Sequence, residues 1–506
     1  MIIVATAEPT GQTRAMERLS AADASFLYME NPTVHMHVTG VLVLDTSSMP
    51  GGARFDVIRD HIVARLHLIP AFRRRLLEIP LGVDHPVWVE DPHFDIDDHV
   101  HHETLRAPGT MAELATYVGN YASEPMDRSR PLWDMVVLDG LADGSLVIVS
   151  KVHHIAVDDT SGNDLMARLV DLTPDAVQVA GPEPPMANPR IPSRATLVVG
   201  AAASRAAHPM RFVSALGRTV ASVARLGRAA IDVRSGGPSM ARPFDSPRVL
   251  FNQSLTRRRA VAFGTASLDD LRFVKDTFET TVNDVFLAAS AAALRGYILD
   301  RGGLCDRPLT CSVPVSVHGL SSGNSSPNQV SNMFVRLPVD TDDPVEQLLR
   351  VRHDTRDAKT VHGAIGADMI GDVTELTPPA IFNLASRMYS RIGLAERLPP
   401  IHNLVISNVP GPPVPLFVAG ARLTGIYPFG PLSEGAGVNI GVISNMGHLD
   451  IGVIGCPDIA PDLEDLLEGI TDGIDRLTDA ARVEVARRKS AKRASRKGGS
   501  GVPKRN

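Results

Sequence analysis

Residues 149–162, VSKVHHIAVDDTSG, hold the feature from which both the fold and the function of this chain are best predicted. Residues 146–152 are rich in β-branched side chains and predict a buried strand. Residues 161–171 place apolar side chains at helical spacing. His153 and His154 therefore lie where a strand ends in a loop, a position that can present a side chain to a cleft.

Asp158 follows His154 by four residues and supplies a carboxylate close to it in the sequence. The pattern His-x-x-x-Asp also begins at His93 and at His353, so its spacing alone is weak evidence. Both of these lie in charged stretches and are interpreted as solvated polar faces. His154 differs because an apolar strand precedes it and small residues follow it, and we interpret it as a functional residue.

The chemistry that suits such a histidine is proton abstraction. A neutral imidazole can take the proton of an alcohol as that alcohol attacks a carbonyl carbon. The sequence has no G-x-S-x-G elbow and no phosphate-binding G-x-x-x-x-G-K-[ST] loop. Neighbouring residues on a strand point to opposite faces, so His153 and His154 do not suit one zinc ion, and one ring should face the cleft. Asp158 is interpreted as fixing the loop, with a direct relay to the imidazole as the alternative.

Length and composition describe an ordinary globular protein with room for two or more domains. Of 506 residues, 44% are apolar and 21% are charged. Three cysteines form no paired framework and have no metal-site spacing, which favours a reducing, cytoplasmic setting. We expect no signal peptide and no membrane span, because no run of 18 or more apolar residues occurs. The chain is expected to be soluble or to lie on a surface.

Two segments of the chain are strongly basic. Residues 186–242 contain nine Arg and one acidic residue, and residues 481–506 contain ten Lys or Arg and one acidic residue. This asymmetry suggests an anionic partner. Residues 195–231 predict a basic amphipathic helix or helix pair, interpreted either as a crossover packed on the body or as a dock for an anionic membrane or lipid-droplet surface. Nucleic acid is not favoured, because the basic tail has no aromatic residue for stacking.

Strand and helix signals alternate along the chain and predict two α/β domains with antiparallel or mixed sheets and a cleft between them. Strands are expected at 35–45, 131–139, 145–152, 260–267, 309–317, 330–339, 404–408, 421–427, 438–445 and 449–456. Helices are expected at 55–68, 111–122, 268–279, 282–302, 345–358, 379–390 and 462–486. The predicted organisation is a disordered extension (1–15), a first domain (16–185), a basic crossover (186–250), a second domain (251–480) and a disordered basic tail (481–506).

Several motifs give the chain a specific resemblance. They are LSAADASFLYMEN (19–31), SRPLWDMVVLDGL (129–141), HHIAVDD (153–159), VNDVFLAASAAALRGYI (282–298), PVSVH (314–318), NQVSNMFVRLP (328–338) and SNVPGP (407–412). In this order they resemble the bacterial wax ester synthase/acyl-CoA:diacylglycerol acyltransferase family that is abundant in mycobacteria. The resemblance implies an α/β (α+β) fold of two chloramphenicol-acetyltransferase-like, CoA-dependent acyltransferase domains with mixed sheets around a central tunnel.

The resemblance also implies roles for particular residues. The family's HHxxxDG motif matches His153, His154 and Asp158, which makes His154 the general base and Asp158 the residue that holds the loop. The family's Asn-Asp motif matches Asn283 and Asp284, for which the alternative is the first turn of a helix.

Two further family motifs suggest contacts with the substrate. The Pro-Leu-Trp motif ends at Trp133, for which the alternative is a core aromatic residue. In SNVPGP, Ser407 and Asn408 follow a strand and precede a rigid turn, so their polar groups can lie at the cleft.

The implied function is an O-acyltransferase that moves a long-chain acyl group from acyl-CoA to diacylglycerol or to a fatty alcohol. Acyl-CoA is a co-substrate, and neither a permanently bound cofactor nor a metal is expected. The alternatives are another hydroxyl or amine acceptor, or a weakly catalytic lipid-binding protein at a membrane or droplet surface.

One residue departs from the family motif: Asp159 stands where the family usually has glycine. Glycine there permits a positive φ or a close approach of substrate to the backbone. An extra carboxylate can also raise the pKa of the imidazole or repel the anionic part of CoA. We therefore expect Asp159→Gly to raise turnover in a steady-state acyl-transfer assay. Unchanged or lower turnover would contradict this interpretation.

Overall fold

The computed structural model describes most of the chain. The described residues are 17–49, 52, 54–82, 84–157, 167–175, 191–193, 195–199, 241, 245–316, 330–365, 388 and 392–498. The predicted N-terminal extension, the helix predicted at 379–390 apart from residue 388, nearly all of the basic crossover, and both Asp158 and Asp159 lie outside them.

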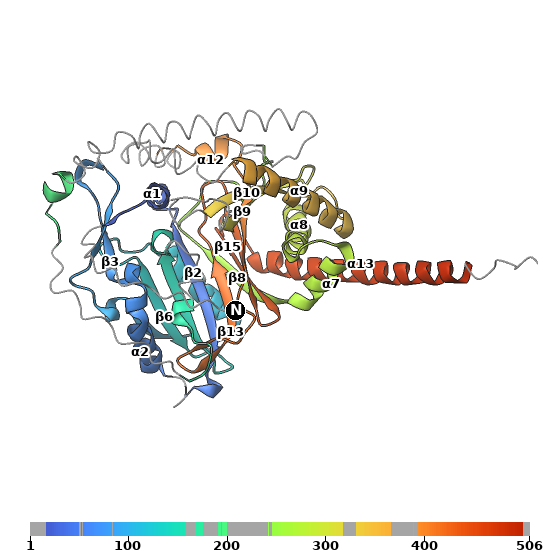
Figure 1. Cartoon of the computed structure of the whole chain (residues 1–506). Helices are drawn as coiled ribbons and strands as arrows, with labels where there is room; N and C mark the ends of the chain where they lie inside the picture. The colour runs from blue at the N-terminus through green and yellow to red at the C-terminus, as the bar shows by residue number, and fades with distance from the viewer. Residues whose placement is uncertain are drawn as a thin grey trace, which may run out of the picture.

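The first large sheet combines strands from both halves of the chain (Figure 1). Its order is β12 (Phe417–Val418), β13 (Ala421–Phe429), β2 (His37–Asp45), β7 (Leu146–His153), β6 (Trp133–Asp139) and β5 (Val100–Thr104). Neighbouring strands are antiparallel except β5 and β6, so the sheet is mixed. The predicted hairpin of β6 and β7 is confirmed.

Short helices and a small sheet surround these strands. The helices are α1 (Ala21–Met29), α2 (Phe55–Arg65) and α3 (Met111–Ser123), and the small sheet has the order β1 (Glu17–Arg18), β4 (Val87–Glu90) and β3 (Arg74–Leu77). Single 3-10 turns lie at Thr46–Ser48, Leu66–Leu68, Pro70–Arg73, Pro80–Gly82, Ile96–Asp98 and His154–Ala156. The last of these, η6, follows β7 directly.

The second large sheet is also six-stranded and mixed. Its order is β10 (Val330–Leu337), β9 (Leu309–Ser316), β11 (Leu404–Val409), β14 (Val438–Asn445), β15 (His448–Gly455) and β8 (Ala260–Ser267). β11 runs parallel to both of its neighbours, and the other pairs are antiparallel. The helices α7 (Leu268–Phe278), α8 (Val282–Asp300), α9 (Pro344–Ile365) and α13 (Leu463–Gly498) pack beside this sheet, and α12 (Leu394–Arg397) is a single turn (Figure 1).

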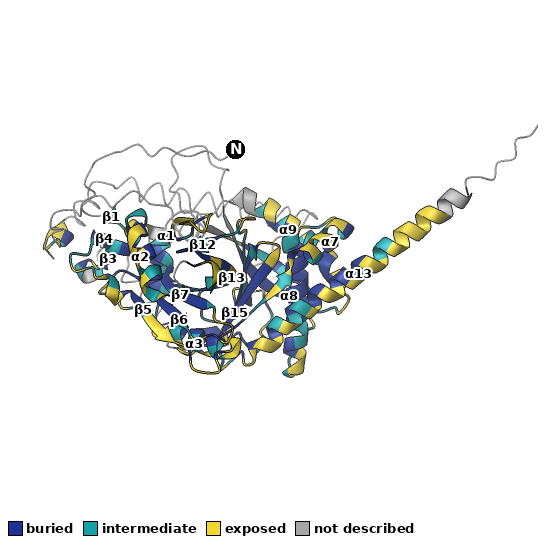
Figure 2. Ribbon diagram, turned by 90° about the horizontal axis from the view of Figure 1, so that it is seen from below, coloured by how far each residue is buried: buried dark blue, intermediate teal, exposed yellow. Residues whose placement is uncertain are grey.

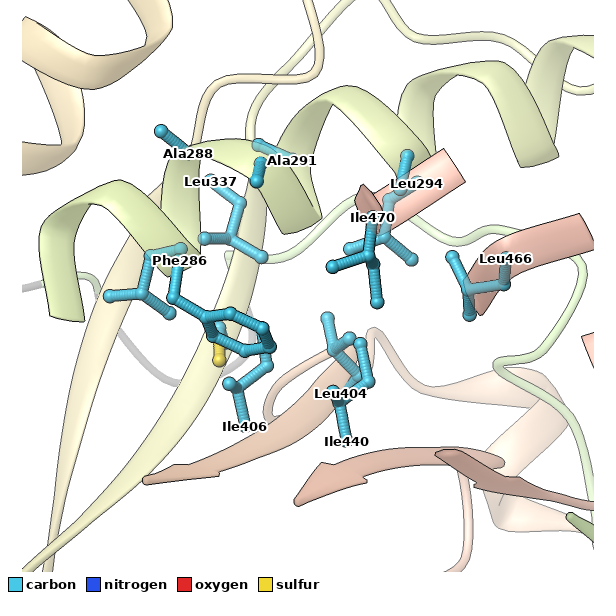
Figure 3. Packing of buried hydrophobic residues seen from close by; sticks show 14 of the residues in the cluster. Phe286, Ala288, Ala291, Leu294, Leu337, Leu404, Ile406, Ile440, Leu466 and Ile470 are labelled. Atoms are coloured by element: carbon cyan, nitrogen blue, oxygen red, sulfur yellow. The ribbon is translucent and has the colours of Figure 1, made fainter. Parts of the chain in front are cut away.

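The core of the second half is built around α8. Its side chains Phe286 and Leu294 meet Ile406 and Ile440 of the sheet and Ile470 of α13 (Figure 3). Among the described residues, α8 is the one helix long and apolar enough to cross a membrane. Most of its side chains are buried in this core, which is the environment of a core helix of a folded domain.

The strand β13 connects the two sheets. It pairs with β2 of the first sheet, while its Pro428 lies against two glycines of the second. Gly441 and Gly452 face each other across β14 and β15. A Cβ atom at Gly441 would lie 2.6 Å from the Pro428 carbonyl oxygen, and one at Gly452 would lie closer still. Only glycine leaves room for the strand to cross here.

A buried carboxylate holds β13 beside this crossing. Asp450 on β15 accepts hydrogen bonds from the Ile426 backbone N–H (2.9 Å) and from Asn445 Nδ2 (3.0 Å). The register of β13 against β2 shifts between Leu423 and Gly425, just before Ile426. Burial raises the pKa of Asp450, and these hydrogen bonds oppose the rise. Asp450 therefore satisfies backbone that the irregular register leaves unpaired.

The strand exchange links the two predicted domains, whose division stays a prediction. The first domain was predicted to lie within 16–185, but its sheet includes β12 and β13, which come from the predicted second domain. Hydrophobic alternation predicts that a strand exists and which face it buries, but it does not name the strand's partner. The strands themselves are confirmed, several with the predicted bounds within one or two residues.

The helix α13 corrects the predicted tail. A disordered segment was predicted from residue 481, but the helix continues to Gly498. Ala, Arg, Lys and Glu favour helix, and Glu484 accepts hydrogen bonds from Arg487 and Arg488 one turn later, both at 2.7 Å. Residues 486–493 of α13 are exposed, and this part of the helix extends away from the body, as Figure 2 shows.

The crossing of β13 predicts unequal effects for two glycine substitutions. We expect Gly452→Ala to lower the free energy of unfolding by about 1–3 kcal/mol, because the methyl group meets the Pro428 backbone. Gly296→Ala is the control: nothing lies within 4 Å of its Cβ position in α8, so alanine should stabilise the helix by about 0.5–1 kcal/mol. Denaturant titrations measure both, and equal effects would contradict the close crossing.

Candidate active site

The two histidines lie at the end of β7, and the neighbouring strands hold their backbone. The His153 N–H donates to the Leu132 carbonyl oxygen (3.0 Å), and the His154 N–H donates to the Met36 carbonyl oxygen (2.8 Å). His153 is the last residue of β7 and His154 is the first of η6. The chain thus turns out of the sheet at this pair.

The side chain of His153 is completely buried and points toward α1. Its Nδ1 accepts a hydrogen bond from the Ile155 backbone N–H (3.3 Å), so a neutral ring carries its proton on Nε2. Nε2 lies 3.5 Å from Oε2 of Glu30, the residue that follows α1. His153 is therefore a residue that holds the turn.

The buried carboxylate of Glu30 lies between the ring of His153 and the guanidinium of Arg128. Burial alone would raise its pKa, but His153 and Arg128 outweigh this effect and lower the pKa to about 2. Nε of Arg128 donates to Oε2 of Glu30 at 3.0 Å, and its Nη2 makes a second contact with the same oxygen. Glu30 is thus ionised at neutral pH and only accepts hydrogen bonds.

The ring of His154 is partly exposed and stacks on Phe26 of α1. The ring centroids are 4.1 Å apart and the planes are inclined by 17°. Burial, with a smaller contribution from His153, lowers the pKa of His154 to about 4, and a hydrogen bond with its own backbone opposes the change. The imidazole is therefore neutral at pH 7 and has an unprotonated nitrogen to accept a proton.

Two predicted substrate-binding residues come together from distant parts of the sequence. Nδ2 of Asn408, in β11, donates to Oδ1 of Asn283, in the first turn of α8, at 3.2 Å. Ser407, also in β11, is partly exposed. The turn after β11 is held by Gly411, whose N–H donates to Oγ of Ser444 at 2.9 Å.

The end of β11 and the turn at His154 belong to one apolar cluster. Ile155 and Ala156 of η6 are buried in it together with Ile443 of β14, and Val409 at the end of β11 packs against it. The cluster therefore joins the loop that carries His154 to the second sheet.

For two other predicted site residues the geometry favours the structural alternative. Asp284 forms a capping box with Thr281 at the start of α8 and accepts a hydrogen bond from Oγ1 of Thr355 (2.7 Å). Trp133 is 1% exposed; its Nε1 donates to the Phe72 carbonyl oxygen (2.8 Å), and its ring stacks on Phe72. Neither side chain has a free polar group to offer a substrate.

A surface groove of about 750 Å³ lies elsewhere, along α3 and residues 257–261. None of the predicted site residues lines it. Two of its arginines are paired: Arg257 contacts Glu124 at 2.9 Å and Arg258 contacts Asp458 at 2.8 Å. We therefore assign it no part in the chemistry.

The described residues contain no group of three or more His, Cys, Asp or Glu side chains that could hold a metal ion. Sequence reasoning missed Phe26 and Glu30 as neighbours of the two histidines, and Arg128 as the partner of Glu30. Phe26 and Glu30 lie within or just beside a recognised motif, but no local pattern gives either a function. Their role depends on the packing of α1 against η6, which the sequence does not show.

Comparison with solved structures identifies the fold as that of the condensation and acyltransferase enzymes. The structure resembles the starter condensation domain of rhizomide synthetase with a TM-score of 0.52 and 14% identity, over 92% of this chain and 95% of that one. It resembles the wax ester synthase/diacylglycerol acyltransferase from Marinobacter aquaeolei VT8 with a TM-score of 0.65 and 28% identity, over 92% of this chain and 99% of that one. The predicted fold class is confirmed.

Sequence comparison gives the family. Residues 19–286 match the wax ester synthase/diacylglycerol acyltransferase catalytic domain, and residues 327–478 match the C-terminal domain of the same family. A Mycobacterium tuberculosis protein named as a diacylglycerol O-acyltransferase is 37% identical over 472 residues, 92% of this chain and 91% of its own length. Another from the same organism is 33% identical over 93% of this chain and 97% of its own length. The chain belongs to the wax ester synthase/diacylglycerol acyltransferase family.

The low pKa of His154 makes stability depend on pH. An unfolded histidine titrates near 6.5, but folded His154 titrates at about 4, so the unfolded state binds the proton first as the pH falls. Stability from this group is therefore complete above about pH 6.5 and is lost as the pH falls toward 4. Between about pH 7 and pH 5, urea titrations should show wild type losing ~1–2 kcal/mol more than His154→Gln. Equal losses would contradict the assignment.

Proposed function

We propose that the chain is an acyl-CoA-dependent O-acyltransferase that uses diacylglycerol as acceptor and forms triacylglycerol, with a fatty alcohol as a second acceptor that gives a wax ester. The observation that carries the proposal is the neutral, partly exposed imidazole of His154 at the junction of the two sheets. Family membership over nearly the whole chain supplies the acyl donor and the class of acceptor. Acyl-CoA is a co-substrate and no permanently bound cofactor is required.

In this mechanism His154 acts as a general base. Its unprotonated ring nitrogen accepts the proton of the acceptor hydroxyl while the hydroxyl oxygen attacks the thioester carbonyl carbon. The new C–O bond forms, the C–S bond breaks, and the imidazolium returns the proton to the CoA thiolate, so that the ester and free CoA leave. The pKa of about 4 keeps the base unprotonated at neutral pH, at the cost of lower basicity.

The other site residues support this step in different ways. Stacking on Phe26 fixes the plane of the His154 ring, and His153 fixes the turn that carries it. Asn283 and Asn408 place two amide groups from the second half of the chain, with Ser407 beside them, as candidates for polar contacts with substrate. Asp158, from the family motif, remains a proposed loop-holding residue.

Product formation from labelled palmitoyl-CoA tests the proposal. With diacylglycerol or hexadecanol as acceptor, we expect wild type to form ester and His154→Ala to lose about 10²-fold or more of the rate. His353→Ala is a matched control, because His353 has the same spacing to an aspartate but lies exposed on α9, and it should retain full activity. Folded wild-type protein that binds acyl-CoA but forms no ester with either acceptor would contradict the proposal.

We also propose that the enzyme acts at an anionic membrane or lipid-droplet surface, where its acceptor dissolves. The exposed end of α13 supports this: residues 482–493 contain six Lys or Arg and one acidic residue. The first part of α13 buries Leu466, Ile470, Ile474 and Leu477 in the core, so the basic end is anchored to the body. A basic helix with few apolar residues suits attraction to anionic headgroups rather than deep insertion.

Co-sedimentation with vesicles tests the docking of α13. Reversing charge at Lys489, Lys492 and Arg493 to Glu should weaken binding to phosphatidylglycerol vesicles in a salt-dependent way, by about 1 kcal/mol or more per residue. The control exchanges Lys and Arg at the same positions and keeps the charge. Equal partitioning of the reversed and control proteins would exclude α13 as the dock, whatever the outcome of the activity assay.

A further inference from the structure

We propose that Glu30 is a positioning residue for the acyl-transfer reaction: its carboxylate selects the His153 tautomer that holds the turn of His154. This inference rests on the proposed role of His154 as the base. Glu30 does not touch the reacting atoms and acts only through His153. Three connected contacts lead from α1 to the base.

The first contact is within α1. Phe26 and Glu30 are four residues apart, and the Glu30 N–H donates to the Phe26 carbonyl oxygen at 3.2 Å. Residues four apart in a helix lie on the same side, one turn from each other. One turn of α1 therefore presents an aromatic ring to His154 and a carboxylate to His153. The separation between these two contacts is fixed by helix geometry.

The second contact is between Glu30 and His153. An ionised carboxylate only accepts, so it favours the imidazole form with the proton on Nε2, the atom 3.5 Å away. With the proton on Nε2, Nδ1 is free to accept. If the proton moved to Nδ1, two N–H groups, those of Nδ1 and of Ile155, would face each other.

The third contact is between His153 and Ile155, and it depends on the His153 tautomer. Nδ1 of His153 accepts the N–H of Ile155, which is the residue after His154. The backbone on both sides of His154 is then fixed, by Met36 at its own N–H and by His153 at the next one. With both N–H groups held, the ring of His154 is held against Phe26. The Glu30 carboxylate thereby fixes the orientation of the His154 ring.

Arg128 has a different part in the same cluster. It donates to the same carboxylate oxygen of Glu30 and to the Leu27 carbonyl oxygen (3.3 Å), and it lies 3.7 Å from Glu78. It therefore stabilises the ionised carboxylate and the end of α1 without contacting His153. Without Arg128, the Glu30 carboxylate still faces Nε2 of His153 as an acceptor. Without Glu30, Nε2 of His153 loses this acceptor. This difference separates positioning from simple stabilisation.

Three variants make the test. Glu30→Met removes the acceptor and keeps the size of the side chain, Glu30→Gln keeps one acceptor oxygen, and Arg128→Gln breaks the same ion pair from the other side. We expect kcat to fall about 10- to 100-fold in Glu30→Met, because a small displacement of a catalytic group has effects of this size. The KM for acyl-CoA should stay near that of wild type. Glu30→Gln and Arg128→Gln should each retain most of kcat.

The tautomer of His153 is the readout that a merely structural ion pair would not change. In protein with ¹⁵N-labelled histidine, the wild-type His153 signal should show a protonated Nε2 and an unprotonated Nδ1. Glu30→Met should lose this pattern, while Arg128→Gln should keep it. The His153 signal is assigned with a His153→Gln variant, and thermal melting checks that each protein is folded.

Two outcomes would overturn the proposal. One is a folded Glu30→Met protein with wild-type kcat; the other is an equal loss of kcat in Glu30→Met and Arg128→Gln, which would indicate lost stability alone. The tautomer measurement needs no substrate, so it stands even if the protein forms no ester. Failure of the proposed function therefore appears as inactive wild type with the expected His153 signal, and failure of this inference appears as an unchanged signal in Glu30→Met.

Discussion

The pairing of β13 with β2 joins the two halves of the molecule, and the position of the site depends on it. β13 lies on Gly441 and Gly452 and is held by Asp450. The second sheet therefore cannot move away from the first unless β13 loses these contacts or its hydrogen bonds with β2. Ile155 and Ala156 are buried in the same apolar cluster as Ile443. The loop that carries His154 is thus packed between elements of both halves, and the base is presented by the junction rather than by either sheet alone.

Two adjacent histidines have different roles: His154 is the proposed base, and His153 holds the turn that carries it. The base needs a neutral ring with partial access to substrate, which burial against Phe26 provides by lowering its pKa to about 4. Holding the turn needs a fully buried, hydrogen-bonded side chain, and His153 supplies it. The two adjacent histidines lie where β7 ends and η6 begins, so the buried ring and the stacked ring belong to different elements. The Arg128 guanidinium then stabilises the ionised carboxylate of Glu30 beside His153.

Much of the fold was predictable because the strands and helices are strongly periodic. β7, β8, β14 and α8 lie where alternation, apolar runs and a capping residue place them. The exchange of β13 was not predictable, because its partner strand β2 lies more than 370 residues earlier in the chain. Tyr427, for example, pairs with Val41. The site divides in the same way. His153 and His154 stand out by chemistry and position, but Glu30 acts only through tertiary contacts, and Trp133 and Asp284 resemble site residues by motif while the structure uses them for packing and capping.

The central claim is that an acyl thioester reaches His154 at the junction of the two sheets. A crystal structure with an unreactive thioether analogue of palmitoyl-CoA tests it most directly, because it locates the carbon that replaces the thioester carbonyl without requiring turnover. The account predicts that this carbon lies against the unprotonated ring nitrogen of His154, with the acyl chain beside the cluster formed by Ile155 and Ile443. An analogue bound with its acyl end elsewhere, such as in the groove along α3, and without contact to His154, would contradict this claim.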